Sequence, residues 1–403
     1  MLYNLFMGEY TVRKLKIGNT QQMSDLASAS GELYSRTVVS FWRTVRNKDL
    51  WLKPSSMMRW HNSNKLHAHS ADAVVQSFYS SLKSWRTRRK ADPNAHPPRR
   101  RRRFFKVQWK SSAIKVRNGK LHLSNGKGNA PLIVDWNWET PKLVEMGWDG
   151  KQYEIRACYA VSQTQTVETG TVVGIDLGEI HLAVAHDGEQ TFILNGRLLR
   201  SKRQYQNKLK AKLASLIHQK KRGSKPKKRL VRSKQRQLAK VKNQIKDILH
   251  KQTSKLVSTL KSRGVQTLAI GDVRDIRQRI NFGTKVNQKL HQWSHGETRA
   301  FLTYKSQRLG MKVEIQCERY SSQVCPSCGQ RHKPKNRTYK CKCGFEFHRD
   351  GVGCVNIRRK YLGCFDVPVV GVMAAPIGLR FRPHLQCSSV QAVAMHSEII
   401  SSL

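Results

Sequence analysis

The rhythm of hydrophobic and polar residues changes several times along the chain, and each change predicts a different kind of element. Residues 9–17 alternate roughly as a strand does, whereas residues 20–50 carry apolar side chains at loose helical spacing. Four more strand-like segments lie within residues 111–161, where Asn118-Gly119 and Asp149-Gly150 are turn signals. The N-terminal part is therefore predicted to be a small β-rich domain with a helical insertion.

Continuous apolar runs predict a second, buried sheet further along the chain. The run TVVGID ends on Asp176, and the segments LAVAHDG and QTFIL follow it as the next strands of a meander. Two later segments, TLAIG at 267–271 and KVEIQC at 312–317, predict further buried strands. Residues 363–403 have no clear period and are predicted to form a poorly ordered tail.

Residues 197–261 predict two long amphipathic helices of unusual charge. The sequence Gly223-Ser224-Lys225-Pro226 breaks the helical pattern, so the two helices should form a hairpin. The segment holds 23 Lys and Arg residues and one acid, Asp247. A basic face is often only solvated, but here almost nothing balances the charge. We therefore expect this hairpin to contact nucleic acid.

The whole chain shares this imbalance. Its 403 residues include 75 Lys and Arg against 26 Asp and Glu, a net charge of +49. Such an excess repels itself and implies a polyanionic partner, with nucleic acid favoured over an anionic membrane surface. The length indicates two or three domains. The sequence has neither a long apolar run nor a secretory signal pattern, so the expected location is the cytoplasm, in association with the nucleoid.

Four of the nine cysteines lie close together in two pairs: Cys325, Cys328, Cys341 and Cys343. Twelve residues separate the pairs, and a glycine follows each pair. This pattern is typical of one tetrahedral zinc ion held by four thiolates, and the closed ligand shell indicates a structural role. The second pair is spaced C-x-C instead of C-x-x-C, and unrelated buried thiols are the alternative. His332 and His348 lie nearby, but neither is needed as a ligand.

Acidic residues at the ends of predicted elements stand out in so basic a chain. Asp176 closes the apolar strand, and Asp350 opens the segment DGVGCVNI, whose apolar spacing indicates the start of a helix. Nucleases of the RNase H type bring two or three carboxylates together around two Mg²⁺ ions. Arg349, beside Asp350, either steers the scissile phosphate or only neutralises the local carboxylates.

Together these motifs resemble the TnpB (OrfB) family of transposon-encoded proteins. The segments that carry the resemblance over about residues 10–360 are, in order, GIDLGEIHLAVAHDG, the basic hairpin, LAIGDVRDIRQ, CPSCG, KCKCG and HRDGVGCVNI. The resemblance implies an α/β fold whose RNase H-like (RuvC) nuclease domain carries a four-cysteine zinc-ribbon insert. It also implies an N-terminal β-barrel-like wedge domain with a helical recognition insertion.

The resemblance further implies domain boundaries. They are a wedge domain at 1–165 with its recognition region at about 20–105, a nuclease core at 166–320 that includes the hairpin at 197–262, a zinc insert at 321–346, a final nuclease segment at 347–362, and the tail at 363–403.

By the same resemblance, the expected activity is Mg²⁺-dependent, RNA-guided cleavage of double-stranded DNA beside a short flanking motif. The enzyme would be a phosphodiester hydrolase encoded by a transposable element of a prokaryotic cell. Its expected partners are a guide RNA and the target DNA, and its metals two catalytic Mg²⁺ ions and one structural Zn²⁺. The alternatives are a nuclease-inactive, RNA-guided DNA-binding repressor and a compact type V CRISPR effector.

The second catalytic carboxylate is the point where the chain departs from the family. Asp176 matches the first catalytic aspartate and Asp350 the last, but Gly271 stands where the family has glutamate. Asp272 should point to the opposite face of its strand. Glu318, which follows the strand at 312–317, is better placed, whereas Glu314 on the same face lies further down that strand. The predicted Mg²⁺ ligands are therefore Asp176, Glu318 and Asp350.

Several basic residues are predicted to bind the phosphates of RNA or DNA. They are Arg99, Arg100, Arg101, Arg102, Arg103, Lys227, Lys228, Arg229 and Arg349. For the block at 99–103 the alternative is a disordered basic loop. Two further residues have open roles: His250 either contacts RNA or packs on the core, and Trp293 fills a core or stacks on a base.

Overall fold

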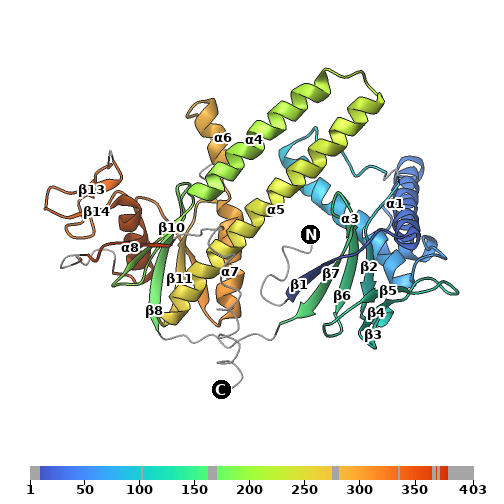
Figure 1. Ribbon diagram of the computed structural model, residues 1–403, viewed down its shortest axis with the longest axis horizontal. Coiled ribbons are helices and arrows are strands. Elements are labelled where there is room, and N and C mark those ends of the chain that lie inside the picture. Colours follow the sequence, from blue (N-terminus) through green and yellow to red (C-terminus); the bar gives the residue numbers. More distant parts are fainter. Residues whose placement is uncertain are drawn as a thin grey trace. The chain divides into compact units, whose positions relative to one another are not determined.

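The computed structural model describes residues 10–100, 103–161, 170–274, 281–334, 336–364, 369 and 373–379. The chain divides into two compact units, Met1–Ser162 and Gln163–Leu403, and each has its own hydrophobic core (Figure 1). Within the described ranges, no helix is both long enough and apolar enough to cross a membrane.

The first unit contains two small antiparallel sheets. The four-stranded sheet has the order β1-β7-β6-β2, with β1 at Tyr10–Lys16, β2 at Val107–Lys110, β6 at Leu143–Trp148 and β7 at Tyr153–Ala160. The three-stranded sheet consists of β3 at Ile114–Arg117, β4 at Lys120–Leu123 and β5 at Leu132–Asp135. Asn118 and Gly119 join β3 to β4, and both have positive φ, as the two-residue hairpin turn requires.

Three helices stand between β1 and β2 in the sequence: α1 at Gln21–Lys48, α2 at Pro54–Trp60 and α3 at Ala68–Ala91. Thr20 caps the first of them, since its side chain accepts a hydrogen bond from the backbone N–H of Met23. Phe41 on α1 and Phe78 on α3 are fully buried and pack edge-to-face with ring centroids 5.1 Å apart. The helices therefore share one core with the strands, to which Trp109 of β2 also belongs.

The second unit is built on a six-stranded mixed sheet with the order β12-β11-β8-β9-β10-β15. Its strands are β8 at Thr171–Asp176, β9 at His181–His186, β10 at Thr191–Asn195, β11 at Val265–Gly271, β12 at Lys312–Gln316 and β15 at Ile377–Leu379. The meander β8-β9-β10 is antiparallel, as the sequence predicts, whereas β8, β11 and β12 run parallel.

Strand β15 corrects the prediction of a poorly ordered tail for residues 377–379. Its backbone pairs in parallel with β10 at the edge of the sheet. A strand of three residues is too short for a hydrophobic pattern to predict this pairing. Most of the remaining tail, including residues 380–403, lies outside the described residues.

The parallel strands bring their carboxyl ends to one edge of the sheet. Ile175 of β8 lies level with Ile270 of β11, and Gly271 lies level with Gln316 of β12. Asp176, Gly271 and the residues that follow Gln316 therefore converge at the same edge. Carboxyl ends of parallel strands are a common place for binding sites in α/β proteins.

The basic helices form the predicted hairpin, with α4 at Arg197–His218 and α5 at Lys225–Ser262 (Figure 1). Ser224 caps α5 by accepting a hydrogen bond from the backbone N–H of Lys227. On α5 the buried residues all lie from Val241 onwards, and on α4 only Leu199 and Leu213 are buried. The outer half of the hairpin therefore buries little against the unit's core and keeps its cationic faces open.

Three shorter helices and a hairpin complete the second unit. They are α6 at Thr284–Gln292, α7 at His295–Arg308, α8 at Arg349–Tyr361, β13 at Thr338–Lys340 and β14 at Glu346–His348. Helix α7 packs against α5, and α8 packs against β8 and β9. Because α8 begins directly after β14, the small hairpin is joined without a linker to the helix that covers the sheet.

Candidate active site and metal centre

Asp176 lies beneath helix α8, at the carboxyl end of β8. A Cβ atom added to Gly353 of α8 would lie 2.5 Å from Oδ2 of Asp176, closer than real side chains come. Glycine at this position therefore lets the helix pass directly over the carboxylate. Asp350 lies in the first turn of the same helix, three residues earlier, so one helix brings the two aspartates into the same neighbourhood.

Glu318 fills the space next to Gly271. A Cβ atom built on Gly271 would meet Oε2 of Glu318 at 2.8 Å and Cδ1 of Ile357 at 2.9 Å. The glutamate carboxylate therefore occupies the place that a side chain at position 271 would enter. Its Oε2 atom is buried, and in the part of the chain that the structure describes it has no hydrogen-bond partner. A buried carboxylate oxygen left in this state is costly unless a proton or a cation satisfies it.

The register of the strands explains how Glu318 reaches this position. Gly271 is paired with Gln316, and Glu318 lies two residues further on, which returns its side chain to the same face. Asp272 is engaged elsewhere, with its carboxylate paired to Arg274 and, at 3.2 Å, to Arg299. Hydrogen bonds from Arg274 hold the pKa of Asp272 below its ordinary value.

Glu314 is also engaged elsewhere, since it forms an ion pair with Lys312 at 3.3 Å. It lies level with Ala269 of β11, two positions before Gly271. Of the acidic residues considered for the second ligand position, Glu318 is the one whose carboxylate fills the gap at Gly271.

The carboxylates at this edge affect one another electrostatically. Burial raises the pKa of Asp176 to about 8, and the negative charges of Glu318 and Asp350 add to the effect. Burial likewise raises the pKa of Glu318 to about 6, with a further contribution from Asp272. Like charges held together in a poorly solvated place favour protonation, and a divalent cation reverses that preference. The donor set therefore fits Mg²⁺ or a similar cation.

Asp350 has an imidazole neighbour that the sequence did not reveal. Nδ1 of His181, the first residue of β9, lies 2.8 Å from Oδ2 of Asp350. Burial acts to raise the pKa of Asp350, but the hydrogen bond with His181 and the charges of His348 and Arg349 bring it below its ordinary value. Nε of Arg349 is 3.5 Å from Oδ1 of Asp350.

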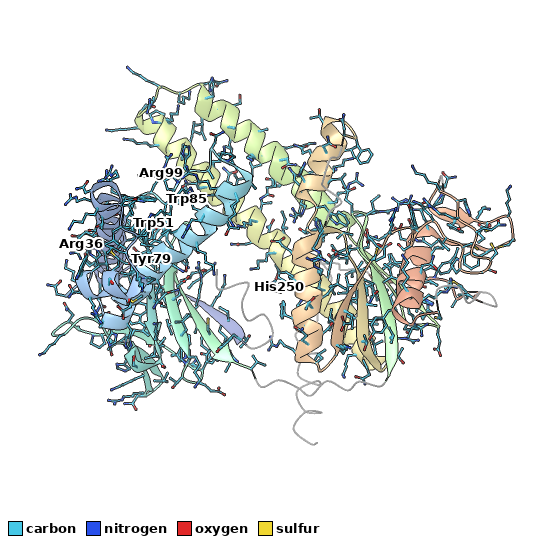
Figure 2. All side chains as sticks on the ribbon, turned by 180° about the vertical axis from the view of Figure 1, so that it is seen from behind. Arg36, Trp51, Tyr79, Trp85, Arg99 and His250 are labelled. Atoms are coloured by element: carbon cyan, nitrogen blue, oxygen red, sulfur yellow. The ribbon has the colours of Figure 1, made fainter. Side chains whose placement is uncertain are left out.

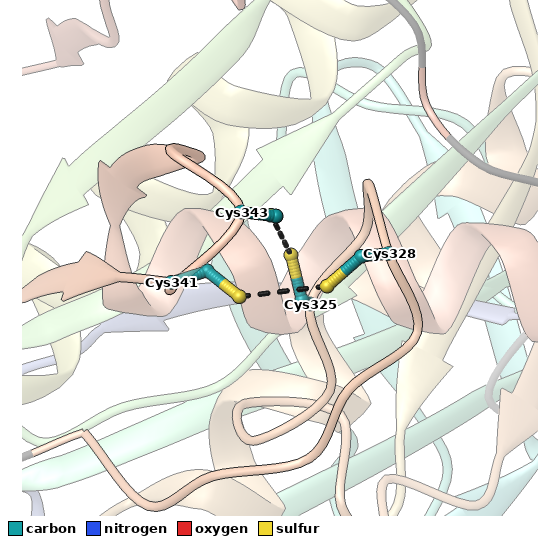
Figure 3. Close-up of side chains that lie close together, drawn as sticks. All are labelled: Cys325, Cys328, Cys341 and Cys343. Carbon is teal, nitrogen blue, oxygen red and sulfur yellow. Dashed lines mark hydrogen bonds between the residues drawn. The ribbon is translucent and has the colours of Figure 1, made fainter.

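The four predicted zinc ligands lie together in the hairpin region (Figure 3). The sulfur atoms of Cys325 and Cys343 are 3.7 Å apart, and those of Cys328 and Cys341 are 3.5 Å apart. Four sulfurs around zinc at about 2.3 Å stand roughly 3.8 Å from one another. The cluster is therefore compatible with a zinc ribbon.

Two glycines shape the turns that carry these cysteines. Gly329 and Gly344 have φ of +72° and +88°, where residues with a side chain are strained. Their N–H groups donate to the carbonyl oxygens of Cys325 and Cys341. The bond at Gly329 spans four residues and the bond at Gly344 spans three, so the shorter C-x-C pair is carried by the tighter turn. His332 takes no part in the cluster, since its Nδ1 faces the hydroxyl of Tyr339 at 3.3 Å.

Comparison with known proteins supports the same interpretation of the chain. Residues 156–277 match the family described as OrfB_IS605, probable transposase, and residues 295–357 match the Cas12f1-like TNB domain. The chain is 31% identical over 132 residues to a TnpB-like protein of Methanocaldococcus jannaschii. The chain is related to TnpB. The matched segments include Asp176, Gly271, the four cysteines and Asp350.

The chain is also similar to the CRISPR-associated endodeoxyribonuclease Cas12f1 of Sulfoacidibacillus thermotolerans, to which it is 23% identical over 207 residues. The two matches cover 32% and 48% of the chain, and each spans 47% of the relative's own length. A solved Cas12f1–sgRNA–target DNA complex has a similar fold, with a TM-score of 0.57 at 11% identity over 84% of this chain and 83% of that one. The mixed α/β fold is therefore shared with Cas12f1.

The predicted nucleic-acid residues of the TnpB-related chain are mostly exposed where the structure describes them. Arg99, Arg100 and Arg103 are exposed, whereas Arg101 and Arg102 lie outside the described residues. Lys228 and Arg229 are exposed near the start of α5. Lys227 is partly buried, and its Nζ donates to the carbonyl of Lys220 across the hairpin turn at 3.1 Å.

Two arginine–tryptophan contacts in the helical region of the first unit were not predicted from the sequence; one is at the exposed Trp51 between α1 and α2, and the other at the buried Trp85 of α3. Trp51 is 41% exposed, and the guanidinium of Arg86 lies 5.0 Å from its ring centroid. Arg89 covers the ring of Trp85 in the same way at 5.2 Å. Figure 2 labels Trp51 and Trp85, with Arg99 and Tyr79, on this unit. The signal in the sequence was the interleaving of tryptophan and arginine around residues 85–89.

Two residues with open roles contribute to packing. The ring of His250 on α5 stacks on Phe301 of α7 with centroids 4.0 Å apart, and its Nδ1 lies 3.2 Å from the hydroxyl of Tyr304. Trp293 is 8% exposed and belongs to the core of the second unit. In this structure His250 therefore packs α5 against α7, and Trp293 fills part of the core.

Proposed function

We propose that the chain is a compact RNA-guided DNA endonuclease of the transposon-encoded TnpB type, with a RuvC-like site formed by Asp176, Glu318 and Asp350. The observation that carries this proposal is the carboxylate of Glu318 in the space beside Gly271, with a buried oxygen that has no partner among the described residues. A catalytic site that had merely lost its glutamate would have no reason to hold a replacement carboxylate there. The similar Cas12f1 is an endodeoxyribonuclease, which supports the same class.

In the proposed mechanism, bound Mg²⁺ would supply a Lewis acid and an activated water for in-line cleavage of the phosphodiester. Asp176 and Glu318, from the ends of adjacent strands, and Asp350, from the helix above them, would provide the negative charge that holds the cations. Both Asp176 and Glu318 must release their protons for this purpose, since burial keeps their pKa values high. Helix α8 fixes the geometry because Gly353 leaves no gap over Asp176.

Guide and target would bind through charge and base pairing. The net charge of +49 and the open cationic faces of α4 and α5 support phosphate binding without sequence selectivity. Sequence would then be read by pairing of the guide RNA with the target strand, and the N-terminal wedge domain at 1–165 would read the short flanking motif. The exposed arginines at 99, 100 and 103 are proposed to bind the phosphates of RNA or DNA.

A nuclease-inactive, RNA-guided DNA-binding protein is the second candidate, and Gly271 is the observation that favours it. The two candidates differ in cleavage and agree in binding. Whether the gene lies beside a transposon end or a repeat array separates the transposon-encoded nuclease from a compact CRISPR effector.

The test starts with sequencing of the RNA that co-purifies with the protein, which identifies the guide and hence the target. The complex is then incubated with a plasmid that carries this target and Mg²⁺. We expect cleavage by the unchanged protein, and in Asp176→Asn a loss of at least about 100-fold with target binding retained. Asp247→Asn, an exposed aspartate of α5, is the matched control and should cleave normally. Tight target binding without cleavage by the unchanged protein would establish the inactive candidate instead.

A further inference from the structure

Two imidazoles and one carboxylate meet at the amino end of α8. His181 opens β9, His348 closes β14, and Asp350 lies in the first turn of α8, so three separate elements contribute. One donor atom from each residue lies within 4.8 Å of the others. The imidazole rings of His181 and His348 are 5.0 Å apart between centroids. The Mg²⁺ site proposed above includes Asp350 but neither of these histidines.

His348 supplies a second observation. Its Nδ1 atom is buried and has no hydrogen-bond partner in the described part of the chain. A buried ring nitrogen without a partner is costly, and a metal ion is one of the few groups that can satisfy it together with neighbouring donors. Nδ1 of His181 and Oδ2 of Asp350 are already 2.8 Å apart. Adjacent ligands of a cation bound at about 2.1 Å are roughly 3.0–3.4 Å apart, so small side-chain rotations would open the site.

The charges around the cluster admit a cation. The positive charges of Arg337 and Arg349 both act on His348 and oppose one. Arg349 lies 3.5 Å from Oδ1 of Asp350, whereas Oδ2 is the oxygen that contacts His181. Asp176 and Asp350 are close enough to interact electrostatically, as the raised pKa of Asp176 reflects. The negative charge of Asp350, whose pKa lies below its ordinary value, would draw a divalent ion towards this end of the helix.

We infer that His181, His348 and Asp350 form a binding site for a divalent transition-metal ion such as Mn²⁺, in which two ring nitrogens and one carboxylate oxygen are the protein ligands. Mg²⁺ takes oxygen ligands almost exclusively, whereas imidazole suits the transition metals. The other interpretation of the cluster is a histidine that only orients Asp350 by a hydrogen bond, and this interpretation predicts no metal–nitrogen bond.

The inference also bears on catalysis, and that part rests on the proposed nuclease function. Asp350 would belong to both the carboxylate group and the histidine cluster through its two oxygens. One of the catalytic cations would then have mixed nitrogen and oxygen coordination, and cleavage at low metal concentration would be faster with Mn²⁺ than with Mg²⁺. Binding of Mn²⁺ itself does not depend on cleavage.

The test is pulsed electron paramagnetic resonance of Mn²⁺ added to the full-length, tag-free, zinc-loaded protein. We expect modulation from directly bound nitrogen, and a change in its frequencies when the histidines carry the heavy nitrogen isotope, which excludes nitrogen from co-purified RNA. His181→Asn and His348→Asn should each weaken Mn²⁺ binding by about tenfold and change Mg²⁺ binding little. His218→Asn, an exposed histidine of α4, is the control and should bind Mn²⁺ normally.

Mn²⁺ bound without histidine nitrogen modulation would overturn the inference, even if either variant failed to fold. Cleavage with the modulation absent would overturn the inference alone. The modulation present in a protein that cuts no guided target would overturn the proposed function alone.

Discussion

At the scale of single residues, the absence of side chains at two positions shapes the candidate active site. Gly271 leaves the space that the carboxylate of Glu318 occupies, and Gly353 allows α8 to pass over Asp176. The resemblance to the TnpB family indicated a missing carboxylate at Gly271, and the period-2 geometry of strands then favoured Glu318 over Asp272. The close approach at Gly353 could not be predicted, because it depends on how a helix packs on a distant strand.

Exchanging the positions of glycine and glutamate tests this spatial relation. Gly271→Glu alone should lose cleavage, because its Cβ would lie 2.8 Å from Oε2 of Glu318 and would add a further carboxylate to the site. The double variant Gly271→Glu with Glu318→Ala should recover at least about a tenth of the original rate, since the charge returns to the same space. The measurement is the cleavage rate of a guided plasmid target. A fully active single variant, or a folded double variant with no recovery, would contradict the relation.

The raised pKa of Asp176 has a consequence for stability in the metal-free protein. With a pKa of about 8 in the folded state against an ordinary value of 3.8, folded Asp176 keeps a proton that the unfolded chain releases. Stability is therefore lost as the pH rises from about 4 to about 8. Asp176→Asn should raise the melting temperature by a few degrees at pH about 8 and by less at pH about 5, at ~2–4 °C per kcal/mol.

The comparison for this variant is Asp247→Asn in the same metal-free buffer. Asp247 forms only an exposed ion pair with Lys251 on α5, so its removal should change stability little at either pH. A melting temperature that Asp176→Asn leaves unchanged, or lowers more at high pH than at low pH, would argue against the buried site.

At the scale of elements, hydrophobic periodicity identified most of the second unit. The strands β8, β9 and β10 and the helices α4 and α5 were predicted from apolar runs and stripes alone. Strand β6 was not predicted, because Glu145 lies on it as a buried residue that Lys106 and Arg156 neutralise at 2.7 Å each. Such pairing is invisible in a sequence pattern, as is the pairing of β15 with β10.

The proposed zinc ribbon is the element whose stability should depend most on its ligands. The small cluster of Tyr339, Phe347, Cys325 and Val352 is too limited a core to hold the segment alone. Cys341→Ser should therefore release the zinc and speed hydrogen exchange in β13 and β14, measured by elemental analysis and mass spectrometry. Cys317→Ser, an exposed cysteine outside the cluster, should do neither. Retention of one zinc per chain by Cys341→Ser would refute the four-cysteine site.

At the scale of the whole molecule, charge is the dominant property. With a net charge of +49, the proposed binding of nucleic acid should depend strongly on salt. The outer half of the α4–α5 hairpin buries almost none of its side chains, so its Lys and Arg side chains are available to phosphate. Composition alone led to the proposal of a nucleic-acid partner, whereas the sequence pattern could not predict which basic residues the fold leaves exposed.

Lys228 and Arg229 give a quantitative test of the hairpin. If each contacts one phosphate, replacing both by glutamine should reduce the slope of log affinity against log salt by about 1–2 units for the co-purifying RNA. The control replaces Lys127 and Lys151, two exposed lysines of the first unit. Titrations at several salt concentrations provide the slopes. Equal slopes for the hairpin variant and the unchanged protein would rule out direct phosphate contacts at these residues.

The central claim is that Glu318 supplies the carboxylate that Gly271 lacks, and guided plasmid cleavage by two variants tests it most directly. Glu318→Gln should lose cleavage by at least about 100-fold while it keeps RNA-dependent target binding. Asp272→Asn, which removes the ion pairs with Arg274 and Arg299 and one negative charge near Glu318, should cleave within a few-fold of the unchanged protein. Full cleavage by Glu318→Gln, with the loss found in Asp272→Asn instead, would contradict the account.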